Sequence, residues 1–144
     1  MRTTMFLTLA AVAIAYGTTV HQSSSDLAGT SWQLIKFQAA DDTTIVPGDK
    51  SKYTITFSSD GRVSARVDCN RASSTWSANG GQLQFGSWSR TSTKCPPGSL
   101  HDKIVNEGGA VRSFVIKDGH LFLSGGGGQY ELERLTSSKR RGGA

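Results

Sequence analysis

The amino-acid sequence predicts a mainly β, antiparallel domain of about eight short strands, either a small barrel or a sandwich, with one short helix. Three observations support this fold class. Several segments alternate apolar and polar residues with the period of two that is typical of half-buried strands. Turn residues interrupt the chain every 8–12 residues or so, at roughly the spacing of short strands. The composition, with 36% hydrophobic residues and 17 glycines among 144 residues, fits one turn-rich domain.

The clearest pair of strands lies between residues 53 and 67. In "YTITFS" (53–58) the residues Tyr53, Ile55 and Phe57 share one face, and threonine or serine occupies the other. The segment "RVSARV" (62–67) alternates in the same way. Because Asp60-Gly61 is a strong turn signal between them, the two runs predict an antiparallel hairpin.

Shorter runs supply the remaining elements. We expect strands at 31–37, around Trp76, around Leu83 and Phe85, around Trp88, at 112–117, at 120–124 and at 129–135. Asp118-Gly119 is expected to form the turn of a second hairpin, and the four glycines 125–128 a flexible loop. A helix is expected at about 99–107, because a Pro-Pro-Gly breaker precedes it and Ser99 can cap it.

The N-terminus has the features of an export signal. Arg2 precedes an apolar run that is too short to span a bilayer, and small residues offer cleavage after Ala15 or Gly17. The alternative is a buried N-terminal helix or strand. We expect residues 1–17 to be a signal peptide and 18–26 a polar linker. No cysteine follows the signal that could carry a lipid, so a soluble periplasmic or secreted protein without a stable membrane anchor is expected.

The positive charge of the chain is concentrated in its last residues. Of the formal net charge of +5, Lys139, Arg140 and Arg141 contribute three units. The segment 136–144 is therefore expected to be a disordered basic tail. Since no basic patch with interleaved aromatic residues is evident in the domain itself, we do not expect nucleic-acid binding.

The chain has two cysteines, Cys69 and Cys95, for which a disulfide is the favoured interpretation. An even number of cysteines in an oxidising compartment indicates disulfide bonding. Closing a loop of about 26 residues would stabilise the fold by roughly 3.5 kcal/mol in the chain-entropy description. Two alternatives are zinc binding, which needs further ligands at metal-like spacing, and a nucleophilic cysteine beside His101 or His120. We also expect Asn70 and Arg71 to cap the strand end beside the bridge, and Trp76 to pack on the sulfurs.

Four motifs occur in an order that resembles one known family. They are "LAGTSWQL" (27–34), "DCNR" (68–71), "TSTKC" (91–95) and "GHLFL" (119–123). Over about residues 27–135 the chain resembles the META domain family, which includes the HslJ-like proteins of bacteria. Family members often carry glycines where this chain has Ala65 and Asp68, so a tight, glycine-dependent backbone is not expected there.

The resemblance implies a fold and a compartment. It implies a small antiparallel barrel-like domain of about eight short strands with one α-helix at about 99–107, usually exported. It also implies that Cys69 and Cys95 form a disulfide. The family has no settled activity, so the resemblance implies no active site.

No group of residues in the sequence predicts catalysis. Ser99, His101 and Asp102 lie within one helical turn, whereas catalytic triads are assembled from separated segments. Helix capping accounts for Ser99 and Asp102 without further assumptions. We therefore expect no catalytic residue, no cofactor and no metal, and hence no enzyme.

Two non-enzymatic roles remain. The favoured expectation is an exported scaffold with a stress-related or secretion-related role in the cell envelope; the alternative is a binder of a lipid or small apolar ligand inside the barrel. The choice depends on whether six large aromatic residues fill the core or face a ligand: Trp32, Phe57, Trp76, Phe85, Trp88 and Phe114. The expected partner is an envelope or extracellular protein, or an apolar small molecule. The chain is expected to be a monomer.

Overall fold

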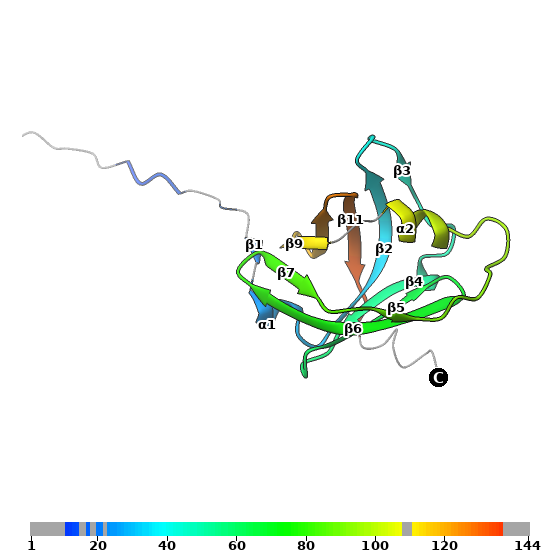
Figure 1. Ribbon diagram of the computed structural model, residues 1–144. Helices are drawn as coiled ribbons and strands as arrows, with labels where there is room; N and C mark the ends of the chain where they lie inside the picture. Colours follow the sequence, from blue (N-terminus) through cyan, green and yellow to red (C-terminus); the bar gives the residue numbers. More distant parts are fainter. Residues whose placement is uncertain (1–10, 15–16, 18–19, 22, 108–110, 137–144) are drawn as a thin grey trace, which may run out of the picture.

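Antiparallel strands dominate the structure (Figure 1), a computed structural model that describes residues 11–14, 17, 20–21, 23–107 and 111–136. The strands are β1 (Val20–His21), β2 (Thr30–Ala39), β3 (Thr44–Ile45), β4 (Tyr53–Phe57), β5 (Arg62–Val67), β6 (Asn70–Asn79), β7 (Gln82–Phe85), β8 (Ser89–Arg90), β9 (Val111–Lys117), β10 (His120–Gly125) and β11 (Gly128–Arg134). The helices are α1 (Ser24–Leu27), α2 (His101–Glu107) and a 3₁₀ turn at Lys50–Lys52. Most of the expected signal peptide and nearly all of the expected basic tail lie outside the described residues.

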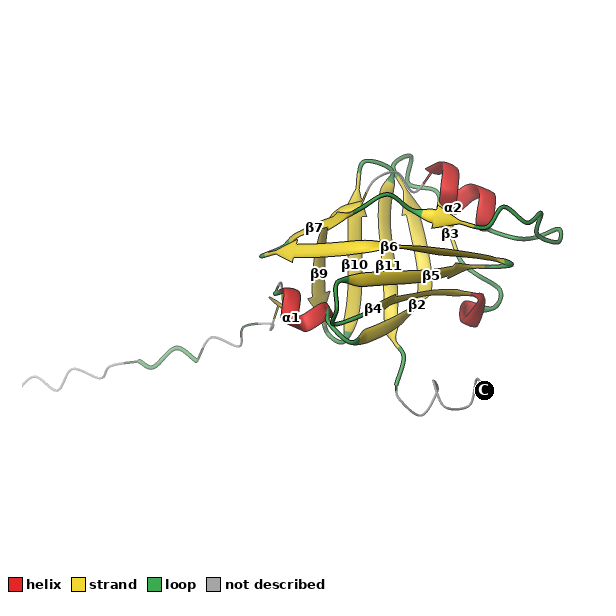
Figure 2. Cartoon of the chain, turned by 60° about the horizontal axis from the view of Figure 1, so that its bottom comes forward, coloured by secondary structure: helices red, strands yellow, loops and turns green. Residues whose placement is uncertain are grey.

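The longer strands follow one another around a closed barrel in chain order. β2, β4, β5, β6, β7, β9, β10 and β11 are successive neighbours, and β11 pairs back onto β2. The seam between β7 and β9 is narrow, with Gln82 opposite Ser113 and the Phe114 N–H donating to the Gly81 carbonyl at 3.0 Å. Figure 2 shows β4, β5 and β6 crossing in front of β9, β10 and β11. The predicted mainly β, antiparallel barrel is confirmed.

Both predicted Asp-Gly turns are present. Asp118 and Gly119 have φ angles of 52° and 77°, so both lie in the left-handed region that a type I′ turn requires. Gly61, with φ of 87°, closes the hairpin between β4 and β5. A further tight turn joins β5 to β6, where Asp68 has φ of 56°. The backbone at Asp68 thus adopts a conformation that favours glycine after all, which corrects our expectation; aspartate tolerates it better than most residues do.

Several local expectations differ from the structure. The segment 18–26, expected to be a linker, contains β1, which pairs with β9, and α1, whose capping box joins Ser23 and Asp26. The four glycines 125–128 do not form a flexible loop: Gly125 pairs with Gly128, which leaves a two-residue hairpin turn. The predicted helix begins at His101, with Ser99 capping it from outside through a 3.1 Å hydrogen bond to the His101 N–H.

One end of the barrel is closed by its own side chains. Leu27, carried by α1, is fully buried in the core cluster together with Trp32 and Phe57. The Trp32 Nε1–H donates to the Thr30 hydroxyl at 2.7 Å, and that hydroxyl donates to the Leu27 carbonyl at 2.5 Å. These hydrogen bonds join residues of the "LAGTSW" motif and hold α1 against the start of β2, where it closes this end of the barrel. A buried indole N–H requires an acceptor, and the Thr30 hydroxyl supplies it.

Helix α2 lies at the opposite end of the barrel. β2 runs between the two ends: it begins beside α1, and its last residues pack with Ile45 in a second small cluster that Leu100 contacts just before α2. The Leu100 N–H donates to the Tyr53 hydroxyl at 2.9 Å, which ties the start of α2 to β4. The described part of the chain contains no helix that is both long and apolar enough to cross a membrane.

Candidate functional site

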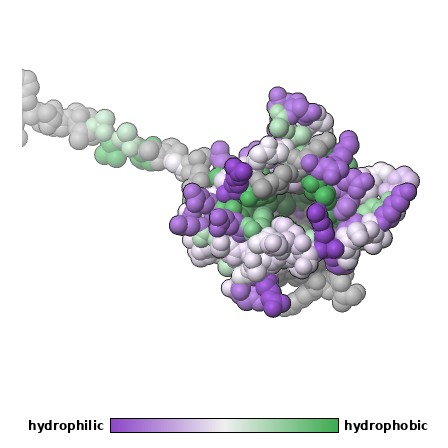
Figure 3. All heavy atoms as spheres, viewed as in Figure 1, coloured by the Kyte–Doolittle hydropathy of each residue, from purple (hydrophilic) through white to green (hydrophobic). Residues whose placement is uncertain are grey.

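A cavity of about 410 Å³ occupies the half of the barrel that lies under α2. Figure 3 shows apolar atoms in the depth of a hollow that opens between more polar surroundings. The apolar lining comes from β2, β4, β5, β7, β9, β10, β11 and α2: Leu34, Ile55, Val67, Phe85, Val111, Leu123, Leu132, Ile104 and Val105. The walls of this half are therefore mostly aliphatic, and the space is open to solvent at one end.

The cavity exists because small residues face inward at this level of the barrel. Ala65 on β5 and Ala72 on β6 are directly opposite each other in the strand register, and both line the space. At the closed end the corresponding inward positions carry Phe57 and Trp76, whose rings pack edge to face with centroids 5.4 Å apart. Side-chain size along the strands thus divides the interior into a filled half and an open half.

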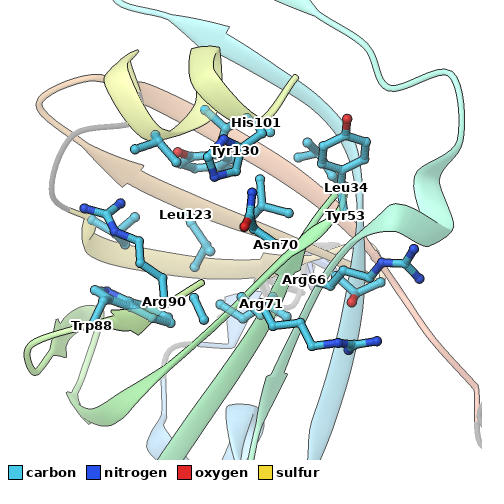
Figure 4. Close-up of a pocket in the computed structure, with 18 of the residues that line it drawn as sticks. Leu34, Tyr53, Arg66, Asn70, Arg71, Trp88, Arg90, His101, Leu123 and Tyr130 are labelled. Atoms are coloured by element: carbon cyan, nitrogen blue, oxygen red, sulfur yellow. The ribbon is translucent and has the colours of Figure 1, made fainter. Parts of the chain in front are cut away.

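Polar groups that line the cavity include Arg90, His101, Asn70 and two tyrosines (Figure 4). Arg90 is opposite Ala72 in the register of β8 and β6, so its side chain leaves the sheet on the inner face. The Nδ1 of His101 lies 2.9 Å from Asp102 Oδ1. Burial raises the pKa of Tyr130 to about 12, so its hydroxyl stays neutral over the physiological range.

Two further arginines border the cavity but turn outward. Arg66 and Arg71 are direct cross-strand partners on β5 and β6, on the face opposite to Ala65 and Ala72. In Figure 4 their guanidinium groups point away from the cavity, whereas the Arg90 side chain runs toward it. The Arg66 Nε–H donates to the Asp68 carbonyl at 2.9 Å. The outer surface here is otherwise rich in hydroxyls, including Thr56, Ser64 and Ser73.

The structure separates the six predicted aromatic residues into two groups. Trp32, Phe57 and Phe114 are fully buried, and Trp76 packs against them at the closed end. Phe85 and Trp88 instead line the cavity, with ring centroids 5.1 Å apart. Trp88 is 36% exposed, so it belongs to the mouth of the cavity and not to the core.

A disulfide joins Cys69 and Cys95, with Cα atoms 5.5 Å apart. It connects the turn between β5 and β6 to the segment that leads into α2. Trp76 does not pack on the sulfurs as expected: it lies seven residues along β6, where it packs on Phe57 and donates from Nε1 to the Ser58 carbonyl at 3.0 Å. A strand rises about 3.3 Å per residue, which places Trp76 far from the bridge.

Asn70, next to the disulfide, was expected to cap the strand end beside the bridge, but the sequence did not reveal its partners. Its side chain is 2% exposed. Its Nδ2–H donates to the Thr93 carbonyl at 2.8 Å, and its Oδ1 accepts from the Thr93 N–H at 2.7 Å and from the Thr91 hydroxyl at 2.9 Å. The amide thus holds the 91–93 segment against β6, and with it the wall of the cavity that carries Arg90.

The Ser99, His101 and Asp102 side chains do not assemble as a triad. The Ser99 hydroxyl accepts the His101 backbone N–H, which is a capping contact. Among the residues that the structure describes, no cluster of three His, Cys, Asp or Glu side chains could hold a metal ion.

Arg90 and the facing alanines were not singled out from the sequence. Ala65 was read as part of an alternating strand and Ala72 received no assignment, and nothing in the sequence shows that the two face each other. Arg90 lies in a two-residue strand whose register with β6 follows only from the fold. A signal in the sequence was the spacing of two between Trp88 and Arg90, both of which line the cavity.

The structure thus defines a small closed antiparallel barrel with an apolar cavity under its helix. The family model of the META domain matches residues 25–139, and the chain belongs to the META domain family. The predicted resemblance is confirmed. A search of curated proteins finds no match.

Two solved structures share the fold. One is the NMR structure of a protein from Burkholderia xenovorans, which is 22% identical, with a TM-score of 0.66, over 92% of this chain and 99% of that chain. The other is the crystal structure of a DUF4847 family protein from Bacteroides vulgatus, which is 15% identical, with a TM-score of 0.51, over 75% of this chain and 93% of that chain. At these identities the similarity concerns the fold alone.

Proposed function

We propose that this protein is a non-enzymatic binding module that takes a small apolar molecule into the open half of its barrel. The observation that carries the proposal is the cavity of about 410 Å³ at the level where Ala65 and Ala72 face each other, in an otherwise filled interior. Small-molecule sites typically have volumes of roughly 300–1,000 Å³ and mainly apolar walls. Each methylene group that leaves water for such a site contributes about 0.8 kcal/mol.

The exposed apolar surface favours a ligand over a protein partner. Within residues 23–107 and 111–136, the large hydrophobic residues that stand exposed are Val46, Trp88 and Val105. Trp88 and Val105 both line the cavity, so two of these three residues lie at its mouth. A scaffold in envelope stress or secretion would need a contact surface for another protein, and such a surface need not be rich in apolar residues. That role stays a prediction without a structural observation in its favour.

We also propose that the protein works after export. The disulfide supports this proposal, since such bonds persist in oxidising compartments. The N-terminal residue of the exported protein tests this proposal. We expect the mature protein to begin at Tyr16 or Thr18. An exported product that retains Met1 would contradict cleavage of a signal peptide.

The proposed binding is tested with decan-1-ol, a neutral probe with a single alkyl chain, and two substitutions on β6. Ala72→Phe places a ring in the cavity, whereas Ser73→Phe places the same ring on the outer face, because adjacent strand residues face opposite sides. We expect calorimetric binding of decanol to the wild type and to Ser73→Phe, and a loss of at least about tenfold in affinity for Ala72→Phe. Melting curves of both variants show whether the barrel is intact. Equal affinity of all three proteins would place decanol outside the cavity.

A further inference from the structure

We infer that the ligand of this cavity is an amphiphile with one alkyl chain and an anionic head group, and that Arg90 binds the head at the mouth. The inference rests on the proposed function, because it assigns the chemistry of the ligand to the same cavity.

The ionised side chains that line the cavity are all arginines. Its described lining includes three of them and no aspartate or glutamate, and the carboxylate of Asp102 lies outside the lining, beside His101. An apolar space with a cationic border favours a molecule with an apolar body and a negative end. A neutral lipid would gain no electrostatic attraction from these side chains, and a cationic amphiphile would be repelled by them.

Among the arginines, Arg90 is placed to meet the head group. It is opposite Ala72 in the register, so its side chain leaves the sheet on the side of the cavity. No carboxylate of the described residues forms an ion pair with it, in contrast to Lys36 with Glu131 and Lys50 with Glu133. A guanidinium offers several N–H donors in one plane, a geometry that matches a carboxylate or a phosphate.

The residues around Arg90 include both apolar and polar side chains. Trp88, two residues earlier, lies on the same face and borders the cavity with Phe85. An alkyl chain that enters past Trp88 would meet Leu34, Leu123 and Leu132 in the interior. His101 on α2 adds a polar group on the opposite side of the mouth, with a side chain that is 18% exposed. The head group would therefore remain close to water while the chain is buried.

Arg71 supplies a matched control for Arg90. It also borders the cavity and is also exposed, and neither arginine has an acidic partner among the described residues. Because Arg71 lies opposite Arg66 on the outer face, its guanidinium points away from the cavity. Replacing either arginine by glutamine removes the same charge, but only Arg90→Gln removes a group that faces the proposed ligand.

The test compares three probes that share one alkyl chain: decanoate, decan-1-ol and decylammonium, each titrated calorimetrically at neutral pH below its micellar concentration. For the wild type we expect decanoate to bind about tenfold or more tightly than decanol, and decylammonium to bind most weakly. Arg90→Gln is expected to reduce decanoate affinity to the level of decanol while leaving decanol unchanged. Arg71→Gln is expected to keep the wild-type order, and salt is expected to weaken decanoate alone.

The possible outcomes separate the inference from the proposed function. Equal affinities for decanoate and decanol in the wild type would overturn the anionic head group and leave an apolar ligand in place. A preference for decanoate that survives in Arg90→Gln, or disappears in Arg71→Gln, would overturn the role of Arg90. Failure of all three probes to bind would overturn the proposed function and this inference with it. Melting temperatures close to the wild type are expected for both variants, since both side chains are exposed.

Discussion

At the scale of single residues, Asn70 connects the features that shape the site. It lies beside Cys69 at the start of β6, and its buried amide satisfies both backbone groups of Thr93. The Asn70 side chain therefore connects the turn between β5 and β6, strand β6 itself and the segment that carries Arg90. The "DCNR" motif drew attention to the cysteine, but the hydrogen-bonding role of its neighbour depends on a partner 23 residues away. No local pattern in the sequence contains that information.

This role of Asn70 predicts a specific loss of stability. Asn70→Ala removes the three hydrogen bonds that its buried amide makes to Thr93 and Thr91, and such bonds contribute about 0.5–1.5 kcal/mol each. We expect chemical denaturation to show a destabilisation of about 2 kcal/mol with the disulfide intact. Thr93→Ala is the matched control, because the side chain of Thr93 makes none of these bonds; it should stay within about 0.5 kcal/mol of the wild type. A control as unstable as Asn70→Ala would contradict the account.

At the scale of elements, the turn between β10 and β11 shows what the sequence could and could not predict. The Asp-Gly hairpins were predicted correctly, because each carries a turn signal between two alternating runs. The glycine run was predicted as a flexible loop, since composition alone does not reveal a strand register. In the structure Gly128 opens β11 opposite Ala39 of β2, with φ of 139°. Close approach of the two strands, and not flexibility, explains glycine at this position.

Two substitutions within the same turn test that explanation. A Cβ atom on Gly128 would lie 2.1 Å from the Gln38 carbonyl oxygen, whereas a Cβ on Gly126 would meet nothing within 4 Å. Gly128→Ala is expected to cost at least about 2 kcal/mol, because backbone atoms cannot yield as a side chain can. Gly126→Ala, whose φ lies outside the left-handed region, is expected to be neutral or slightly stabilising. Thermal denaturation of the pair decides the point, and equal melting temperatures would refute a close-approach role for Gly128.

At the scale of the whole molecule, the barrel is a simple meander with two unlike ends. α1 and the aromatic residues fill one end, and α2 covers the other above an open cavity. The sequence predicted the strands and the fold class, and the family resemblance distinguished a barrel from a sandwich. The sequence did not predict the division of the interior into a filled half and an open half. The free volume depends on which inward-facing residues of different strands lie at the same level of the barrel. The six aromatics were treated as one group, although only two of them border the cavity.

The central claim, that the open half of the barrel holds an alkyl chain, is tested most directly by intermolecular nuclear Overhauser effects between decan-1-ol and methyl-labelled protein. The account predicts contacts from the alkyl chain to the methyl groups of Leu34, Ile55 and Leu123, which line the cavity. Val46, which is exposed and does not line the cavity, serves as the internal control and should show none. Contacts confined to Val46 and other surface methyl groups, or no contacts at saturating decanol, would contradict it.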